Sequence, residues 1–382
     1  MSRRPIHVPA TRLLGLLALA AACTPALRLG REAAPGAIET WIVARDAAVA
    51  AGVTAPTAPA LALATHAHGT PTAPEVPRLD QTRIKTMLIG PIATIERTKT
   101  YAAAGTASDG FVCFTPPGAP ARQDYLVRLG RRTFAILVRD PVAARELVRT
   151  RPGATLVDAA ADGRILVPAG PIGSKSAELT VETIGLVPWR DGAYELTVPR
   201  ATEGEVILEA DVYGPGPIVV VSSPSHAIDA APQSVEHLRV ALRDPGTLRD
   251  DDFVLRYRVD PSDRPGAIVV EADGAEQVVA LVVHPLETGH EPVAASDITI
   301  DWNGTPVTEV LPAVIGRVSA GAALVVLART QGVVADQILV HARVGTQTRT
   351  ITLTRSDVVP STGLPTLKLL WARARDVATP RR

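Results

Sequence analysis

The sequence predicts a mainly β protein: a β-sandwich domain with one short helix, followed by a second β-sandwich-like region and a short C-terminal helix. Runs that alternate apolar and polar residues are interrupted by turn residues about every eight to twelve positions, the spacing of an all-β sandwich. The 382 residues include 33 Pro and 29 Gly, which favour short segments and turns. Hydrophobic residues make up 46% and aromatics only 3%, so the core must consist mainly of Val, Ile, Leu and Ala.

The N-terminus has the anatomy of a secretory signal. Three arginines precede the apolar run "LLGLLALAAAC", which is too short to span a bilayer and ends on small residues. We therefore expect a signal peptide over residues 1–22. The run resembles a bacterial lipobox, in which Cys23 is lipidated and becomes the mature N-terminus, although Ala20 stands where Leu is usual. A plain signal peptide and an apolar core helix are the two alternatives.

Cleavage before Cys23 would leave a mildly acidic protein. Lys and Arg would fall from 39 to 36 against 39 Asp and Glu, a net charge of −3. The positive and negative residues nearly balance, and the sequence shows no cluster of Lys and Arg of the kind that a nucleic-acid surface needs. We therefore expect no nucleic-acid partner. Only Cys113 would remain as a thiol, and its apolar neighbours predict a buried, inert side chain. We expect export to a bacterial cell envelope and anchoring to a membrane, with a periplasmic or secreted protein as the alternative.

Residues 23–78 are rich in Ala, Pro and Thr and predict a tether. A short helix is expected at 37–51 within it. His66 and His68 stand two apart, which would place both on one face of a strand. Because no nearby Cys, Asp or Glu completes a ligand set, we interpret them as part of a solvated linker and predict no metal site.

The pattern of residues 79–200 predicts a compact β domain. "TRIKTMLIGPIATIERTKTY" predicts two strands joined at Gly90–Pro91, and "DYLVRLGRRTFAILVRD" predicts a hairpin with its turn at Gly130–Arg131. Several further alternating runs follow. The pattern predicts a sandwich of about eight short strands.

One segment breaks this strand rhythm and predicts the single helix. In "PVAARELVRT", residues 141–150, the proline suits a first helical turn and Asp140 suits an N-cap. Val142, Leu147 and Val148 are expected to share its apolar face. A Pro-Gly pair ends the element.

Residues 201–376 predict strands almost throughout. Runs such as "EVILEADVYG", "DFVLRYRV" and "QVVALVVHP" alternate or are fully apolar, and turn residues separate them. Near the end, Leu367, Leu370 and Trp371 recur at helical spacing, with two arginines beyond them. We expect a short amphipathic helix that packs on a sheet.

Three stretches resemble the VIT domain, the vault and inter-alpha-trypsin module. "LGRRTFAILVRDPVAARELVRTRPGATLVD" is similar to that family's strand, helix and return strand. "VPAGPIGSKSAELTVETIGLVPWRDGAYELTVPR" is similar to its closing strands, and "PIVVVSSPSHAI" with "RDDDFVLRYRV" to the segment that follows in inter-alpha-trypsin inhibitor heavy chain-like proteins. The resemblance covers about residues 80–285. "DITIDWNGTPVTEVLP" and "LWARAR" are similar to the family's C-terminal β-region.

The resemblance implies that one domain is missing. Such proteins usually carry a von Willebrand factor A domain, whose Asp-x-Ser-x-Ser motif presents oxygen ligands to Mg²⁺. The motif does not occur in this sequence. We therefore interpret residues 286–296 as the junction left by a deletion of about one domain. The segments on its two sides are expected to share one β-domain, with 286–296 as an exposed connection and no metal or other cofactor.

Candidate catalytic residues occur in "SSPSHAID", where Ser222, Ser223 or Ser225 could act as nucleophile and His226 as base. Sequence neighbours on a strand point to opposite faces, and the Gly-x-Ser-x-Gly elbow is absent, so we interpret the segment as a structural turn.

Other candidate sites also have structural explanations. Asp250–Asp252 suit a solvated loop better than a Ca²⁺ site, and Trp189 and Trp302 suit strand anchors better than ligand contacts. The pentapeptide at 359–363 is similar to a sortase signal, but no hydrophobic span follows it.

The sequence therefore predicts a non-enzymatic bacterial envelope lipoprotein that acts as a structural or protein-interaction module. Its expected partners are a membrane, through lipid on Cys23, and an envelope protein. The alternatives are a module that binds a small ligand or glycan, and a hydrolase that uses Ser225 and His226.

Overall fold

The structure is a computed structural model, and the protein is mainly β, as the sequence predicts. The residues that it describes are 39–45, 57–63, 66–67, 70–71, 77–102, 108–115, 123–129, 132–159, 164–172, 176–201, 203–214, 216–244, 248, 251–260, 265–273, 275–288, 291–355, 367, 370–371 and 374–375.

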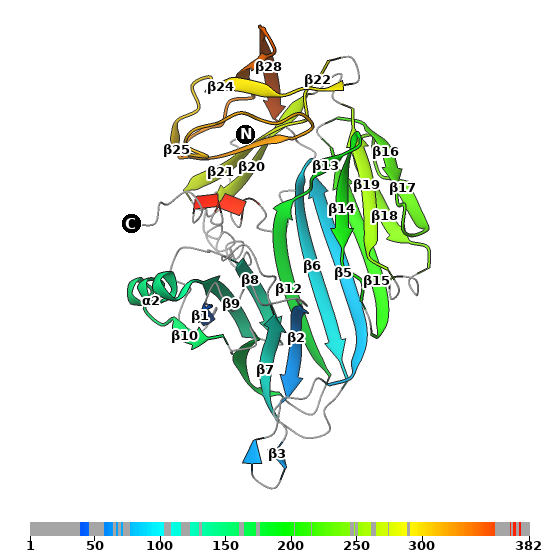
Figure 1. Ribbon diagram of the computed structural model, residues 1–382, viewed down its shortest axis with the longest axis vertical. Coiled ribbons are helices and arrows are strands. Elements are labelled where there is room, and N and C mark those ends of the chain that lie inside the picture. The colour runs from blue at the N-terminus through cyan, green and yellow to red at the C-terminus, as the bar shows by residue number, and fades with distance from the viewer. Residues whose placement is uncertain are drawn as a thin grey trace, which may run out of the picture.

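The largest sheet among these residues has ten strands (Figure 1). The two hairpins expected around Gly90–Pro91 and Gly130–Arg131 are both present as antiparallel pairs within it. In spatial order its strands are β10 (Thr155–Asp158), β1 (Glu39–Ala44), β9 (Arg132–Arg139), β8 (Gln123–Leu129), β12 (Ala177–Leu186), β6 (Ile92–Tyr101), β5 (Leu79–Ile89), β15 (Glu205–Tyr213), β18 (His237–Leu242) and β17 (Ile228–Pro232).

Two smaller sheets pack on one face of the large sheet. The smaller sheets contain β11 (Ile165–Ile172), β7 (Ser108–Thr115) and β2 (Thr57–Leu63), and β13 (Trp189–Arg190), β14 (Ala193–Val198), β19 (Phe253–Val259) and β16 (Ile218–Ser222). The core between the large sheet and the β11–β7–β2 sheet includes Phe134, Leu179 and Phe114. The core between the large sheet and the β13–β14–β19–β16 sheet includes Leu208 and Tyr194. The side chains of successive strand residues alternate between faces, so both cores lie on the same side of β6 and β12.

A seven-stranded sheet forms the C-terminal part, at the top of Figure 1. One of its faces encloses a core that includes Leu281 and Val340, and its other face packs on Ile89 and Ile92 of the large sheet. Its strands are β24 (Ala295–Asp301), β27 (Gln337–Val344), β28 (Gln347–Arg355), β20 (Gly266–Asp273), β21 (Glu276–Val283), β26 (Leu324–Thr330) and β25 (Val307–Leu311). Two short hairpins are β3 (His66–Ala67) with β4 (Thr70–Pro71) and β22 (Glu287–Thr288) with β23 (Glu291–Pro292).

The predicted helix is confirmed as α2 (Pro141–Thr150). Asp140 is its N-cap, and its Oδ1 accepts a hydrogen bond from the N–H of Ala143 at 3.0 Å. The expected apolar face is only partly correct. Leu147 and Val148 pack against the sheet, but Val142 is 76% exposed and the buried residue is Ala144.

The predicted tether and its helix are wrong over two segments. Residues 39–44 form β1, a central strand that pairs in parallel with both β9 and β10, and not a helix. Residues 57–63 form β2, which pairs with β7. The β-branched and aromatic side chains of "ETWIVA" suit a strand between two others, where Ile42 and Val43 are fully buried. Residues 1–38, with the expected signal peptide and Cys23, lie outside the described residues.

The expected division at residue 200 is also wrong. β15 pairs in parallel with β5 over nine residues, from Glu205 with Gln81 to Tyr213 with Ile89, so strands on both sides of residue 200 belong to one sheet. The division visible in the structure lies instead before β20, where the seven-stranded sheet begins.

The segments flanking the proposed junction do lie in one sheet, because β21 and β24 both belong to the seven-stranded sheet. The exposed connection expected at residues 286–296 is only partly found. Leu286 and Val293 pack against the core and Ala295 is buried, while Glu287 lies 3.4 Å from Arg258 in an ion pair. This contact with the β14 sheet is non-local, so the sequence alone does not reveal it.

Candidate functional site

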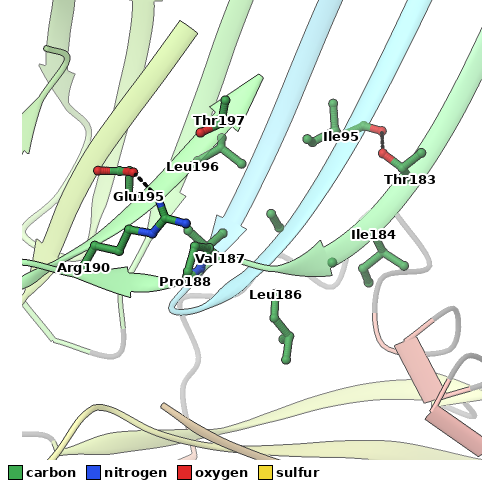
Figure 2. Close-up of a pocket in the computed structure, with 12 residues that line it drawn as sticks. Ile95, Thr183, Ile184, Leu186, Val187, Pro188, Arg190, Glu195, Leu196 and Thr197 are labelled. Carbon is green, nitrogen blue, oxygen red and sulfur yellow. Dashed lines mark hydrogen bonds and ion pairs between the residues drawn. The ribbon is translucent and has the colours of Figure 1, made fainter. Parts of the chain in front are cut away.

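An open groove lies beside β14 on the covered side of the large sheet (Figure 2). Its volume is about 330 Å³. The floor comes from Ala93 and Ile95 of β6, and the other lining residues are 183–188, Arg190 and 195–197. The groove therefore lies where the smaller β13–β14–β19–β16 sheet ends and the inner face of the large sheet continues.

The path of the chain before β14 opens this groove. Asp191 and Gly192 both have positive φ, at 47° and 79°, and form the two-residue turn that joins β13 to β14. β13 pairs with β14 only at Trp189 and Arg190. Val187, which precedes β13 in the chain, does not lie beside β14: its N–H donates instead to Pro91 O at 2.6 Å. The rest of β14 therefore has no neighbouring strand on this side among the described strands.

Aromatic packing and hydrogen bonds hold β14 in place. The ring of Tyr194 lies edge-on to Trp189 at 4.8 Å between centroids and 5.3 Å from the ring of Tyr257. Its hydroxyl lies 2.7 Å from Nδ1 of His284, and the hydroxyl of Tyr257 donates to Gly90 O at 2.6 Å. These contacts join β14 to the seven-stranded sheet and to the β5–β6 turn, so one wall of the groove is rigid.

Burial controls the charge of this network. Desolvation lowers the pKa of His284 to about 4, so its imidazole is neutral at pH 7. Desolvation also raises the pKa of the Tyr194 hydroxyl above its usual value. The bond between them therefore joins two neutral groups, and no residue that the structure describes bonds the buried Nε2 of His284.

Charged side chains form the rim of the groove. Arg190 lies 3.2 Å from Glu195 in an ion pair, and Arg256 lies 3.8 Å from the other carboxylate oxygen of Glu195. Arg256 also donates to the main-chain oxygens of Arg190 and Asp191. Arg256 lies on β19, behind β14, so Arg190 and Glu195 are the two charged residues that line the groove and their charges balance.

The interior of the groove is largely apolar. Ile95 is only partly buried, although it stands on the face of β6 that the smaller sheets cover elsewhere. Thr183 lies opposite Ile95 on β12 and shares this face. Leu186 is 57% exposed, but its side chain points away from β14 (Figure 2), on the other face of the sheet with its partner Ile92. A partly exposed apolar floor of this kind is a candidate interaction surface.

The candidate Ser–His pair is close in space and forms part of a hydrogen-bonded turn. Ser225 Oγ lies 2.7 Å from His226 Nδ1, and it also accepts a hydrogen bond from Val254 N–H at 2.8 Å. Ser223 Oγ accepts from the N–H of His226. No described residue bonds the buried Nε2 of His226, so an orienting carboxylate is absent from the described part of the chain. These bonds close a turn, as the sequence indicates.

The other sequence candidates are dispersed. Asp252 accepts a hydrogen bond from Arg200 N–H at 2.9 Å, while Asp250 lies outside the described residues, as do His68 and 359–363. Among the residues that the structure places, no three His, Cys, Asp or Glu side chains gather into a group able to hold a metal ion.

Trp189, Trp302 and Cys113 contribute to the packing of the strands. Trp189 and Trp302 pack against the two sandwich cores, which confirms them as strand anchors. Cys113 is half-buried and not buried as expected, because Val112 and Phe114 on either side of it occupy the inward positions of β7.

No family model and no curated protein matches this chain. In the part of the chain that the structure describes, no helix has the length and apolar character needed to cross a membrane. Most of the groove residues lie in the stretch 167–200, which resembles the closing strands of the VIT domain, but nothing in that resemblance marks them as a site. One local signal is the Pro-Trp pair at 188–189, which indicates that the preceding strand ends there.

Proposed function

We propose that this protein is a non-enzymatic envelope lipoprotein that acts as a protein-interaction module. The observation that carries the proposal is the groove beside β14. It combines a partly buried isoleucine on an apolar floor with a polar rim, which is the anatomy of a protein-binding surface. The wall formed by β14 is held by Tyr194 and Tyr257, so a partner would bind a surface that is already formed.

We also propose that the chain is a shortened inter-alpha-trypsin heavy chain-like protein with a VIT-like first domain. Two features support this. β9, α2 and β10 follow one another as strand, helix and return strand, in the order that the resemblance implies. β21 and β24 flank residues 286–296 and lie in one sheet, as a lost insertion between them requires.

Lipid on Cys23 would hold the module at a membrane. We expect intact-mass and N-terminal peptide mass spectrometry of the native protein to show cleavage before Cys23 and two or three acyl chains, enough for stable anchoring. A Cys23→Ser variant should remain uncleaved or unlipidated and leave the membrane fraction. Native protein that retains residues 1–22, or that is released with an unmodified Cys23, would exclude the lipoprotein.

A photocrosslinking residue at Thr183 should test the interaction role. In intact envelopes we expect it to form a discrete adduct with one protein, because Thr183 lines the groove opposite Ile95, on the same face of the large sheet. The matched control is the same residue at Val333, which is 83% exposed and is not among the residues that line the groove.

Competition gives this experiment its specificity. Purified wild-type protein in excess should suppress the Thr183 adduct, whereas a Thr183→Lys protein should compete at least tenfold less well, because a lysine at this position fills the groove and adds charge. Identical adducts from both crosslinking positions, or equal competition by the two proteins, would contradict the proposal.

A small ligand or glycan is the second candidate. The groove volume of about 330 Å³ lies near the lower end of the usual range for ligand sites, about 300–1,000 Å³. Native mass spectrometry would favour this candidate if a bound small molecule accompanies wild-type protein and is lost from Thr183→Lys.

A further inference from the structure

Two cationic side chains stand on the inner face of the large sheet, at the junction of the two sandwich cores. Along β6, Arg97 and Lys99 lie between Ile95, which packs against the core of the β13–β14–β19–β16 sheet, and Tyr101, which belongs to the core of the β11–β7–β2 sheet. Both are half-buried. Alternate residues of a strand share a face, so their Cα atoms are about 7 Å apart and the two long side chains can converge on one ligand.

No carboxylate among the described residues pairs with Arg97. Its Nη2 donates to the main-chain oxygen of Pro199 at 3.2 Å, and no other described residue bonds it. Its cross-strand neighbours are apolar, Ile84 on β5 and Val181 on β12. Burial lowers the pKa of Arg97, but a guanidinium keeps its charge at neutral pH. Charges withdrawn from water are normally paired, so this position favours a bound anion.

Glu203 is the carboxylate that acts on Lys99 among the described residues. Burial, together with the charge of Arg97, lowers the pKa of Lys99 to about 8, and Glu203 acts in the opposite direction. Glu203 is exposed and lies in the connection that leads to β15. Arg97, Lys99 and Glu203 together carry a charge of +1, so the junction retains an excess of positive charge.

A buried hydroxyl lies beside these cations. Thr82 on β5 is the direct cross-strand partner of Lys99, so the two side chains are on the same face with Cβ atoms about 5 Å apart. Thr82 is 1% exposed, and no described residue bonds its Oγ1. A buried hydroxyl without a hydrogen bond costs free energy, and a hydroxyl can donate to an oxyanion. Arg97, Lys99 and Thr82 therefore offer three kinds of donor at one position.

We propose that this junction binds a small oxyanion, a phosphate, sulfate or carboxylate group, between Arg97, Lys99 and the hydroxyl of Thr82. The guanidinium offers paired N–H donors and the ammonium offers a compact charge, and both form strong charge-assisted bonds to oxyanions. The anion would also offset the repulsion between the two cations. None of the three residues lines the groove beside β14, so the site is independent of the interaction role proposed above.

Calorimetric titration of the full purified protein with sodium sulfate tests the site. At physiological ionic strength and neutral pH we expect one-to-one binding, weakened at least tenfold in Arg97→Gln and in Lys99→Gln. Arg83→Gln and Lys85→Gln are the matched controls. They remove the same charges from exposed positions on the opposite face of β5, where salt screens them, and should bind within about twofold of the wild type.

The hydroxyl is tested by a pair of threonine variants. Thr82→Val keeps the shape of the side chain and removes the donor, so sulfate should bind about threefold more weakly. Thr86→Val is the control, because the hydroxyl of Thr86 is also buried without a bond from a described residue but lies opposite Ile95 and not beside a cation. It should bind sulfate normally.

The pH dependence of binding identifies Lys99 in the unchanged protein, so this measurement does not depend on the folding of a variant. The ammonium loses its proton above about pH 8, whereas the charge of sulfate stays constant. Sulfate should therefore bind at least threefold more weakly at about pH 9.5 than at neutral pH. Lys99→Arg keeps its charge and should lose less affinity over this range.

A free anion and the anionic group of a larger molecule share this chemistry, and a second titration separates them. Glycerol phosphate that binds as tightly as inorganic phosphate would assign the site to a phosphate ester, and weaker binding of the ester would assign it to the free ion. Sulfate that fails to bind the wild type at millimolar concentration would overturn the site. Equal binding by Arg97→Gln, Lys99→Gln and their two controls would overturn it as well.

Discussion

Replacing Trp371 with alanine should lower the free energy of unfolding by about 4 kcal/mol, because it removes a large buried aromatic side chain. Trp371 is 2% exposed and occupies the core between the large sheet and the seven-stranded sheet, with Ile92 and Val282 among its neighbours. The guanidinium of Arg329 lies 5.7 Å from the ring centroid and adds a cation–π contact. The variant loses this core contact on both sides at once.

Urea unfolding followed by circular dichroism would measure the loss. We expect a lower midpoint with an unchanged slope, the mark of a change in stability alone. Val333→Ala serves as the control, since Val333 is 83% exposed and its truncation should change stability by less than about 0.5 kcal/mol. A loss below about 1 kcal/mol in Trp371→Ala would mean that the C-terminal residues do not help to join the two sheets.

Local patterns predicted the elements that depend on neighbours in the sequence. The hairpins at Gly90–Pro91 and Gly130–Arg131 carry turn residues between alternating runs. α2 carries its own cap, Asp140, and a proline in the first turn. The C-terminal helix was predicted from Leu367 and Trp371 at helical spacing, and both are buried in the structure as expected.

Elements that depend on distant partners were missed. β1 lies in an Ala- and Pro-rich region and is a strand because β9 and β10, about one hundred residues later in the chain, bond to it on both sides. The parallel pairing of β5 with β15 joins two regions that turn residues separate, so the sequence indicates a boundary where the sheet continues. The residue pattern within β1, β5 or β15 does not show which distant strand each of them pairs with.

The candidate site was not predictable for the same reason. Ile95 and Thr183 become part of a groove only because the chain does not lie beside β14 until Pro188 and the smaller sheet ends there. Charged clusters are equally non-local. Arg128 on β8 pairs with Glu182 at 2.7 Å and with Glu96 at 2.8 Å, and burial raises the pKa of Glu182. These strands are adjacent only in the folded sheet.

The stability of the protein should fall steeply between pH 6.5 and pH 4 because of His284. Burial lowers its pKa in the folded state to about 4, against 6.5 for an ordinary histidine. In this window the unfolded chain binds a proton at His284 and the folded protein does not, so acid favours unfolding. Its stabilising contribution is complete above pH 6.5 and is lost as the pH falls through 4. The difference in pKa corresponds to about 3 kcal/mol.

A His284→Gln variant should separate this effect from the titration of other groups. The amide retains a hydrogen-bonding group for Tyr194 but does not titrate, so its free energy of unfolding should fall by about 3 kcal/mol less than that of the wild type across the window. His341→Gln is the matched control, since His341 lies at an accessible position on β27 and bonds Thr350. Urea unfolding at several pH values measures all three proteins. Equal pH slopes for the wild type and His284→Gln would show that His284 can be protonated within the fold, and that the contact between β14 and the seven-stranded sheet tolerates a charge.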